Sequence, residues 1–329
     1  MSRAYYCTVK ELNELGKENI PDQFKSNMHL IYSSPATLAF NSPGAEGFGV
    51  KRAGLAIPDS IMLIVAPGCC GRNTSLISSM REYDNRFFYL MMDETDIVTG
   101  RHLKKIPKAV EEICESLEKK PSVVMICITC VDALLGTDME RVCRKAEERA
   151  GLPVRPCYMY ALTREGRKPP MVHVRQSLYS LLEPAKKMGN VVNLLGFFSP
   201  LIDDCELYDI LHSAGIKTIH EISRCRDFDE YKTMSEANFN LVLHQEARAA
   251  AEDFHERLKI PFIELRRLYQ TDKIENQYQA FGSVLGVTFD TTAYRKAAEQ
   301  AVENFRKVCP DASFAVGECM NGDPFELAL

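Results

Sequence analysis

The chain has 329 residues, of which 46% are hydrophobic and 26% charged, and this balance is typical of a soluble globular protein with room for two or three domains. Its formal net charge of −5 gives no support for a nucleic-acid partner. None of its apolar runs approaches the roughly 20 residues that cross a bilayer, and the polar N-terminus lacks the apolar region of a secretion signal. We therefore expect a cytoplasmic protein that binds neither a nucleic acid nor a membrane.

Short apolar runs alternate with amphipathic segments in the first part of the chain. Strands are predicted over 60–68, 87–92, 121–130 and 152–162, and helices over 103–120 and 136–151. Strands that alternate with helices indicate βαβ units and a mostly parallel sheet. A basic, proline-containing stretch over 163–174 interrupts this rhythm, and a helix over 175–187 is predicted to follow it.

The alternation restarts near residue 185. Strands are predicted over 189–198, 217–223, 238–244 and 260–265, and helices over 204–215, 246–259 and 291–310. The tail is predicted to form a strand, a turn and the first turn of a helix. We therefore predict an α/β fold with two Rossmann-like parallel-sheet domains, over 1–185 and 186–310, and the start of a further domain over 311–329.

Two groups of cysteines stand where predicted strands end. The chain has 12 cysteines, and in a reducing compartment most are expected to be small buried side chains rather than disulfides. The run "IVAPGCC" ends in Cys69 and Cys70, and "MICITC" ends in Cys127 and Cys130. Because ligands gather at the carboxyl ends of parallel strands, both groups are expected at one edge of the sheet. Thiolates there can hold an inorganic cluster, which usually takes four of them.

Spacing alone leaves other interpretations of these cysteines open. Side chains alternate along a strand, so Cys127 and Cys130 point to opposite faces, and Cys127 is expected in the core. A single Cys-x-x-Cys pair is half of a usual zinc site. A thioredoxin-type dithiol is a further alternative, although that motif opens a helix. Cys69 is an additional candidate ligand, and a buried structural role is an equal alternative for it.

Four segments, in this order, resemble the nitrogenase component 1 superfamily. That group contains the molybdenum–iron protein subunits, their cofactor-assembly scaffolds, and dark-operative protochlorophyllide reductases with related tetrapyrrole reductases. The matching segments are "APGCCGRNTS" (66–75), "DETDIVTGRHLKKIPKAVEEI" (93–113), "PSVVMICITCVDALLGTDME" (121–140) and "NVVNLLGFF" (190–198). The first resembles the Gly-x-x-Gly-Cys-Gly loop of the family, and the third resembles its strand that ends in Thr-Cys. The resemblance therefore aligns Cys70 and Cys130 with cluster ligands.

This resemblance implies an iron–sulfur cluster, expected as 4Fe–4S, on Cys70 and Cys130, with Cys69 as an additional candidate metal ligand. Two thiolates are half of a four-thiolate set. The resemblance therefore implies a partner that supplies the other half, either a second copy in a homodimer or a sister component 1 subunit. It also implies an ATP-dependent iron protein as electron donor. The chain itself has no Walker A motif, so it is not expected to hydrolyse ATP.

The sequence departs from the nitrogenase pattern in ways that bear on the reaction. A further ligand cysteine precedes the Cys70 position in the nitrogenase α-subunit, and the segment 40–50 of this chain contains none. The strand that precedes the cofactor cysteine in the family corresponds here to "NLVLHQEA" (240–247), which has His244 and no cysteine. Dinitrogen reduction is therefore not supported. His244 is a candidate catalytic proton donor, and a structural role for it is the favoured alternative.

These observations predict an oxidoreductase subunit that passes electrons from an iron protein to a substrate in the crevice between its domains. The alternative is a non-catalytic scaffold on which a metal cofactor is assembled or carried. A third interpretation is a degenerate homologue in which the thiols are simply buried. The final "GDPFELAL" resembles the start of a helix that continues into a third α/β domain in the family.

Overall fold

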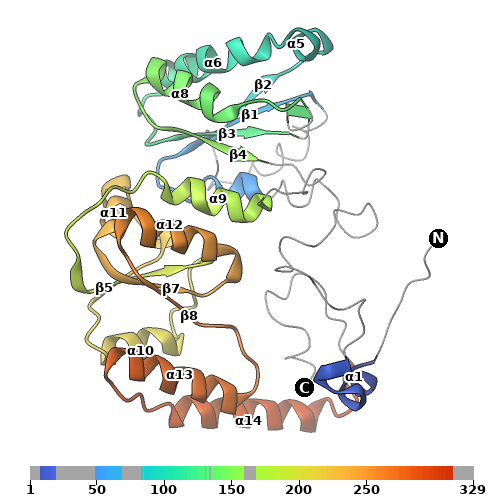
Figure 1. Ribbon diagram of the computed structural model, residues 1–329, viewed down its shortest axis with the longest axis vertical. Helices are drawn as coiled ribbons and strands as arrows, with labels where there is room; N and C mark the ends of the chain where they lie inside the picture. The colour runs from blue at the N-terminus through green and yellow to red at the C-terminus, as the bar shows by residue number, and fades with distance from the viewer. Residues whose placement is uncertain are drawn as a thin grey trace.

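The structure is a computed structural model that describes residues 8–19, 49–68, 83, 85–129, 131–132, 135–158 and 168–313. Within these ranges the chain forms two parallel four-stranded sheets, one above the other along the long axis of the molecule (Figure 1). The parallel α/β fold expected from the sequence is confirmed. The segments outside these ranges include Cys69, Cys70, Cys130 and the predicted tail element. No helix in the described part of the chain has the length and apolarity needed to span a bilayer.

The first sheet has the strand order β2-β1-β3-β4. Its strands are β1 (Ile61–Ala66), β2 (Phe87–Met91), β3 (Val124–Ile128) and β4 (Val154–Tyr158). Every residue of β1 and β3 is buried, because helices cover both faces of the sheet. On one face lie α6 (His102–Ser116) and α8 (Met139–Ala150), and on the other lies α9 (Pro170–Tyr179) (Figure 1).

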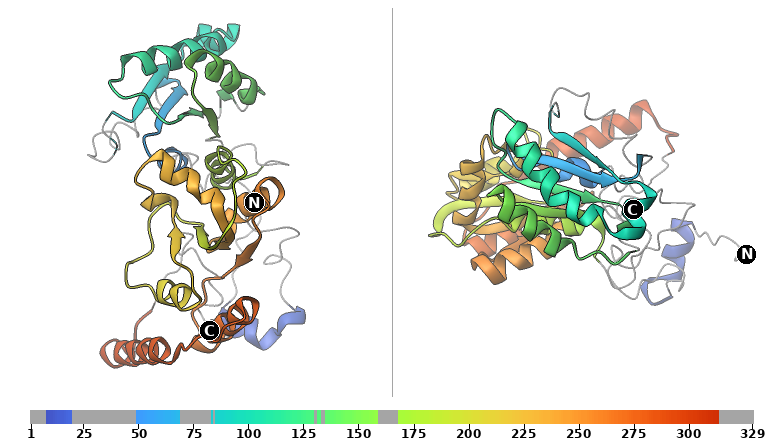
Figure 2. Two further views of the ribbon diagram at one scale, coloured as in Figure 1. Left: turned by 90° about the vertical axis from the view of Figure 1, so that its left-hand side faces the viewer. Right: turned by 90° about the horizontal axis from the view of Figure 1, so that it is seen from above.

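The second sheet repeats the arrangement with the strand order β6-β5-β7-β8. Its strands are β5 (Met188–Leu195), β6 (Thr218–His220), β7 (Ala237–Val242) and β8 (Phe262–Glu264). The helices around it are α10 (Glu206–Ser213), α11 (Phe228–Thr233), α12 (Arg248–Leu258), α13 (Thr271–Leu285) and α14 (Thr292–Val308). Figures 1 and 2 show α12 on the side that faces the first sheet and α10, α13 and α14 on the far side.

Several short elements accompany these sheets and helices. They include α1 (Val9–Leu15), α5 (Glu94–Thr99) and the 3₁₀ helices Lys17–Asn19, Ile222–Arg224, Met234–Glu236 and Gln245–Ala247. The helix α5 matters for the site below, because two residues separate it from β2 and two residues separate it from α6.

The two sheets share one hydrophobic core. Val174 and Leu178 of α9 are fully buried in a cluster that contains residues of β1, β3, β5 and α12. The rings of Tyr179 and Phe254 join α9 to α12, with their centroids 5.1 Å apart. The helix α9 therefore lies between the sheets and packs against both.

The helices differ from the sequence-based prediction in their limits and in their number. The helix predicted over 175–187 is α9, which begins at Pro170 and ends at Tyr179. Proline favours the first helical turn because it has no N–H to lose there, and the downstream Pro184 cannot continue a helix. The helices α1, α5, α11 and α13 were not predicted, and α13 contains Gly282 in its last turn. That glycine is required by packing, since a Cβ atom there would lie 2.6 Å from the Val287 carbonyl oxygen.

Candidate functional site

The central strands of the first sheet form a topological switch point. The chain moves from β1 to β2 on one side of the sheet and returns to β3 on the other side of β1. Val65 pairs with Ile128, so β1 and β3 end beside each other at the same edge. Crevices that bind ligands in open α/β sheets lie at such points, outside the carboxyl ends of the strands. The segment with Cys69 and Cys70 follows β1, and Cys130 follows β3 after a single residue, Thr129.

The candidate ligands Cys69, Cys70 and Cys130 themselves lie outside the described residues, so their assignment stays a prediction. Their neighbour Cys127 is described, and it is fully buried in the core between the sheets. It pairs with Cys157 of β4, and burial raises the pKa of the Cys157 thiol well above its usual value. Protonated buried thiols are poor metal ligands. The expectation that Cys127 is a core residue is confirmed.

A buried polar pair follows β3 at this edge. The Asp132 carboxylate is completely buried, and its Oδ1 lies 2.9 Å from Nε2 of His102 at the start of α6. The same oxygen accepts a hydrogen bond of 3.0 Å from the Thr137 hydroxyl. His102 is also buried, and its Nδ1 lies 3.0 Å from the backbone oxygen of Asp96 in α5. These contacts connect the turn after β3 to the junction of α5 and α6.

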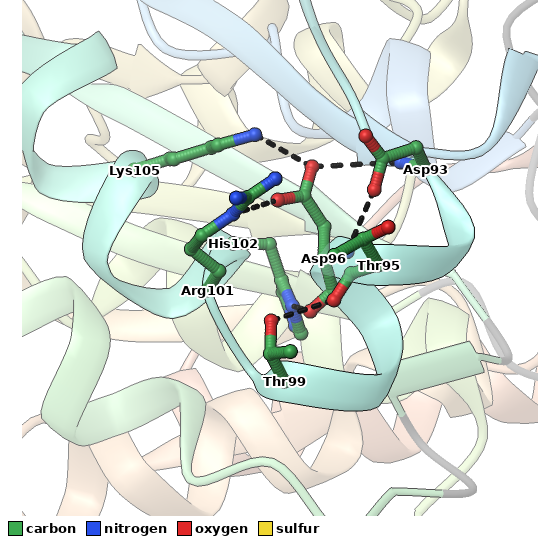
Figure 3. A network of polar contacts seen from close by, with 7 residues as sticks. All are labelled: Asp93, Thr95, Asp96, Thr99, Arg101, His102 and Lys105. Carbon is green, nitrogen blue, oxygen red and sulfur yellow. Dashed lines mark hydrogen bonds and ion pairs between the residues drawn. The ribbon is translucent and has the colours of Figure 1, made fainter.

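The Asp96 side chain is a second buried carboxylate in this network (Figure 3). It lies 2.6 Å from the Lys105 ammonium and 3.0 Å from the Arg101 guanidinium. The hydrogen bond from Lys105 is the main reason that the pKa of Asp96 falls to about 2, with the Arg101 hydrogen bond acting in the same direction. Asp93 caps the same helix, because its carboxylate accepts from the Asp96 N–H at 2.7 Å. Two cations and a cap therefore fix α5 against α6.

Two buried oxygen atoms at this edge have no hydrogen-bond partner among the described residues. They are Thr129 Oγ1 and Asp132 Oδ2, and they belong to residues on either side of Cys130. Buried polar groups are normally paired, so unpaired ones need an explanation such as an absent ligand or ion. The chemistry of this edge fits an iron–sulfur cluster, because the adjoining segments supply cysteines and the unpaired Thr129 hydroxyl can donate to a sulfur, whereas the Asp132 oxygen only accepts. The described residues alone contain no group of three or more metal ligands, so a cluster would depend on the cysteine segments.

His244 lies at the switch point of the second sheet, two residues beyond β7. Its Nδ1 accepts a hydrogen bond of 3.2 Å from the Glu246 N–H, which places the ring proton of the neutral side chain on Nε2. The ring packs edge-on against Phe197, with centroids 5.7 Å apart. The backbone of Gly196 touches His244, because a Cβ atom at Gly196 would lie 2.8 Å from the His244 nitrogen. His244 therefore has a structural role as a cap, and its catalytic role stays a prediction.

Arg175 of α9 reaches the same strand ends, at Gly196 and Glu246, from the helix that lies between the two sheets. It donates to the Gly196 carbonyl oxygen at 2.6 Å and lies 2.8 Å from the Glu246 carboxylate. Its guanidinium also lies over the Phe198 ring, 4.5 Å from the centroid. Burial lowers the pKa of Arg175, while the nearby Glu246 carboxylate acts in the opposite direction. The carboxyl ends of β5 and β7 are therefore tied to α9.

Residues 46–316 match the family model described as nitrogenase component 1 type oxidoreductase. The chain belongs to this family. The match includes both sheets and all of the segments that carry the cysteines discussed above, so the resemblance inferred from the sequence is confirmed.

Other component 1 proteins are similar at low identity. Nitrogenase iron-molybdenum cofactor biosynthesis protein NifE of Nostoc sp. is 25% identical over 283 residues, which cover 84% of this chain and 58% of the relative. The NifE protein of Rhizobium meliloti is 27% identical over 274 residues, which cover 81% of this chain and 54% of the relative. The nitrogenase molybdenum-iron protein alpha chain of Methanosarcina barkeri is 25% identical over 64% of this chain. The chain spans about half the length of the two NifE proteins.

Solved structures of the family share the fold of this component 1 chain. Nitrogenase Cp1 at pH 6.5 superposes with a TM-score of 0.57 and 19% identity, over 84% of this chain and 55% of the other. At this identity the likeness concerns the fold alone.

Sequence reasoning missed the network of His102, Asp132 and Asp96. The partners His102 and Asp132 are 30 residues apart, and only the packing of α6 beside β3 brings them together. The available signal was the polar composition of "DETDIVTGRH" (93–102), directly before an amphipathic helix. That composition was interpreted only as part of the family motif.

Proposed function

We propose that this component 1 protein holds an iron–sulfur cluster at the edge of its first sheet and serves to assemble or carry a metal cofactor. The observation that carries the proposal is the switch point between β1 and β3. Cysteine segments adjoin both strand ends there, and unpaired buried oxygens flank one of them. The names of the NifE relatives, which describe cofactor biosynthesis proteins, support the choice of a scaffold over a reductase.

The second switch point also favours the scaffold. In a reductase of this kind the substrate is expected beside His244, at the carboxyl ends of β5 and β7. The ion pair of Arg175 and Glu246 lies at that place, and Gly196 and His244 are in backbone contact there. A substrate would have to displace a buried arginine that makes several hydrogen bonds. This is a costly requirement, because it would leave Glu246 without its partner.

In the proposed site, Cys70 and Cys130 supply thiolates, and Cys69 is the additional candidate ligand. When bound, a 4Fe–4S cluster would supply one-electron redox chemistry. Two thiolates from one chain leave the set incomplete. A second copy of the chain, or a sister component 1 subunit, is proposed to supply the rest. A cytoplasmic location accords with this chemistry, because thiols stay reduced there.

A nitrogenase-like reductase is the second candidate function. The orientation of His244 favours it, since the Glu246 N–H fixes Nδ1 as an acceptor and leaves Nε2 as the proton-bearing atom. In that case an ATP-dependent iron protein would deliver the electrons, and His244 would supply protons to the substrate.

Metal analysis of cysteine variants tests the site. The protein is reconstituted anaerobically with ferrous iron and sulfide, and bound iron is measured per chain. Cys70→Ala and Cys130→Ala are expected to lose most of the iron, because each removes a thiolate ligand. Cys127→Ala is the matched control on the same strand, and it should keep its iron while losing about 1–3 kcal/mol of stability from the cavity. Equal iron in all variants would refute the proposed ligands.

Stoichiometry then separates the two functions. Loaded protein is mixed with an apo-ferredoxin that lacks its 4Fe–4S cluster, and the ferredoxin absorbance reports each cluster it receives. A carrier is expected to give up its cluster once, after which transfer stops. A reductase would keep its iron and consume electrons continuously when an ATP-dependent iron protein and ATP are supplied. The second result, abolished by His244→Ala, would overturn the scaffold assignment.

A further inference from the structure

The contact between His102 and Asp132 is a hydrogen bond, and the partners of the His102 ring show where its hydrogen atoms lie. The Asp96 backbone oxygen can only accept, so Nδ1 of His102 carries a hydrogen and donates to it. The other ring nitrogen, Nε2, lies 2.9 Å from Asp132 Oδ1. A second proton must lie between these two atoms, on the ring or on the carboxyl group, because two lone pairs would otherwise face each other. The pair is therefore a donor–acceptor contact with both ring nitrogens engaged.

This contact holds the turn that leads into α8, which follows Cys130 in the chain. Thr129 is fully buried behind β3, residues 131–132 are helical, and the turn ends where Asp138 caps α8 through the Arg141 N–H at 3.0 Å. Between these ends, Asp132 is the only buried charged residue in the described part of the turn. Its backbone oxygen accepts from the Thr137 N–H at 3.1 Å, so Asp132 closes the turn through backbone and side chain together. The fixed point on the other side is the junction of α5 and α6.

Ion pairs and a helix cap hold the junction of α5 and α6 in place. Asp96 is held by Lys105 and Arg101, and its helix is capped by Asp93. His102 is thus attached to a well-fixed element through Nδ1 and reaches the turn through Nε2. A buried pair of ionisable side chains is weak evidence for net stability, because apolar residues of similar volume often stabilise as well. What such a pair adds is a defined position for the groups that it joins.

We propose that His102 is a positioning residue that orients Asp132 and so fixes residues 131–132 and 135–137, which follow Cys130 at the first switch point. This inference rests on the proposed function in one respect, namely that Cys130 is a ligand. Its structural content is independent of any metal: one ring bridges a fixed helix junction and the buried carboxylate two residues after Cys130. The unpaired Asp132 Oδ2 and Thr129 Oγ1 are held at the same edge by this arrangement.

Hydrogen exchange of the metal-free protein tests the structural part. The reporters are the amides of Leu135 and Thr137, which donate to the backbone oxygens of Val131 and Asp132 at 3.0 and 3.1 Å. His102→Ala is expected to speed exchange of this segment by about tenfold or more, since it frees a hydrogen-bonded carboxylate. His102→Gln should restore much of the protection, because its amide can donate to Asp132. Unchanged exchange in His102→Ala would overturn the proposal.

A matched control separates positioning from general loss of stability. Asn193 of β5 is fully buried and donates to the Met234 oxygen at 2.8 Å and to the Asn240 side chain at 2.7 Å. Asn193→Ala removes buried hydrogen bonds in the second sheet, and it should leave exchange of the 131–137 segment unaltered. Faster exchange of that segment in Asn193→Ala, equal to that in His102→Ala, would show a global effect and contradict the inference.

Electron paramagnetic resonance of the iron-loaded protein tests the connection to the ligand. His102→Ala is expected to shift the g values of the reduced cluster and to speed iron loss to a chelator, while His102→Gln stays close to the wild type and Asn193→Ala matches it. An unchanged spectrum and rate in His102→Ala would refute a role at the cluster. If the wild-type protein takes up no iron, the proposed function fails, and the exchange experiment still decides whether His102 fixes the turn.

Discussion

At the scale of single residues, Asp96 shows how charge organises the edge of the first sheet. Its carboxylate is buried, and it remains ionised because Lys105 and Arg101 lie within hydrogen-bonding distance. A buried carboxylate with two cationic partners holds the neighbouring helices in place more firmly than an exposed ion pair does, because hydrogen bonds fix it from several sides.

The Asp96 network makes stability dependent on pH in the acid range. The folded-state pKa is about 2 and lies below the ordinary value of 3.8, so the unfolded chain takes up the proton first as the pH falls. The stabilisation from Asp96 is therefore complete above pH 3.8 and is lost as the pH falls through about 2. Thermal unfolding of the wild type and Asp96→Asn should show a difference in Tm that shrinks over this interval. A difference that grows toward low pH would contradict the assignment. Asp229→Asn, which alters an exposed pair with Lys232, is the control and should change Tm little.

The loss of Arg175 should destabilise the protein strongly, because its buried side chain joins α9 to the ends of two strands of the second sheet. Arg175→Met keeps most of the volume but leaves the Glu246 carboxylate and the Gly196 oxygen without their donor. We expect a loss of about 3 kcal/mol in the free energy of unfolding, measured with urea. Arg248→Met is the control, because Arg248 is half exposed and its ion pairs lie at the surface. A loss below about 1 kcal/mol for Arg175→Met would show that the pair does not tie α9 to the second sheet.

Single-residue roles could be predicted from the sequence where they depend on local geometry. The burial of Cys127 follows from the alternation of side chains along a strand. The contact of His102 with Asp132 could not be predicted in this way, because it depends on how α6 packs beside β3. The same applies to Arg175, whose partners come from the ends of two strands of the other sheet.

At the scale of elements, the backbone at the end of β5 is held in a conformation that only glycine adopts easily. Gly196 has φ 147°, a conformation that side chains disfavour, and a Cβ atom there would lie 2.8 Å from the His244 nitrogen. Gly196→Ala is therefore expected to cost about 2–4 kcal/mol through backbone strain and a steric clash. Gly215→Ala is a matched control, since Gly215 has φ 85° but nothing within 4 Å. Urea unfolding should find the control clearly less affected, and equal losses would mean that the contact with His244 is unimportant.

Strands were more predictable than helices in this chain. All eight described strands overlap segments predicted from apolar runs. The signal is clearest for β1 and β3, which are buried throughout and continuously apolar. The limits of α9 and the existence of α1, α5, α11 and α13 were missed. The start of α9 depends on Pro170 and α13 accommodates Gly282 through packing, while α1, α5 and α11 have six or seven residues, too few for a helical period to stand out. Periodicity alone does not contain that information.

At the scale of the whole molecule, the two sheets are joined by one core through α9. The helix α9, which carries Arg175, therefore connects the core of the first sheet to the carboxyl ends of β5 and β7. The assembly needed to complete a cluster is a property of more than one chain. If the proposed ligands are correct, the partner must lie against the edge where β1 and β3 end. We expect a stable interface there to bury at least about 1,000 Å² in total.

Native mass spectrometry of the anaerobic, iron-loaded protein tests whether two chains share one cluster through Cys70 and Cys130. A twofold homodimer places the same pair of thiolates on both sides of the axis, so we expect a dimer that carries about four iron atoms. Cys130→Ala should yield protein without that iron. A monomer that holds a full complement of iron, or a dimer with about four iron atoms on each chain, would contradict the shared cluster.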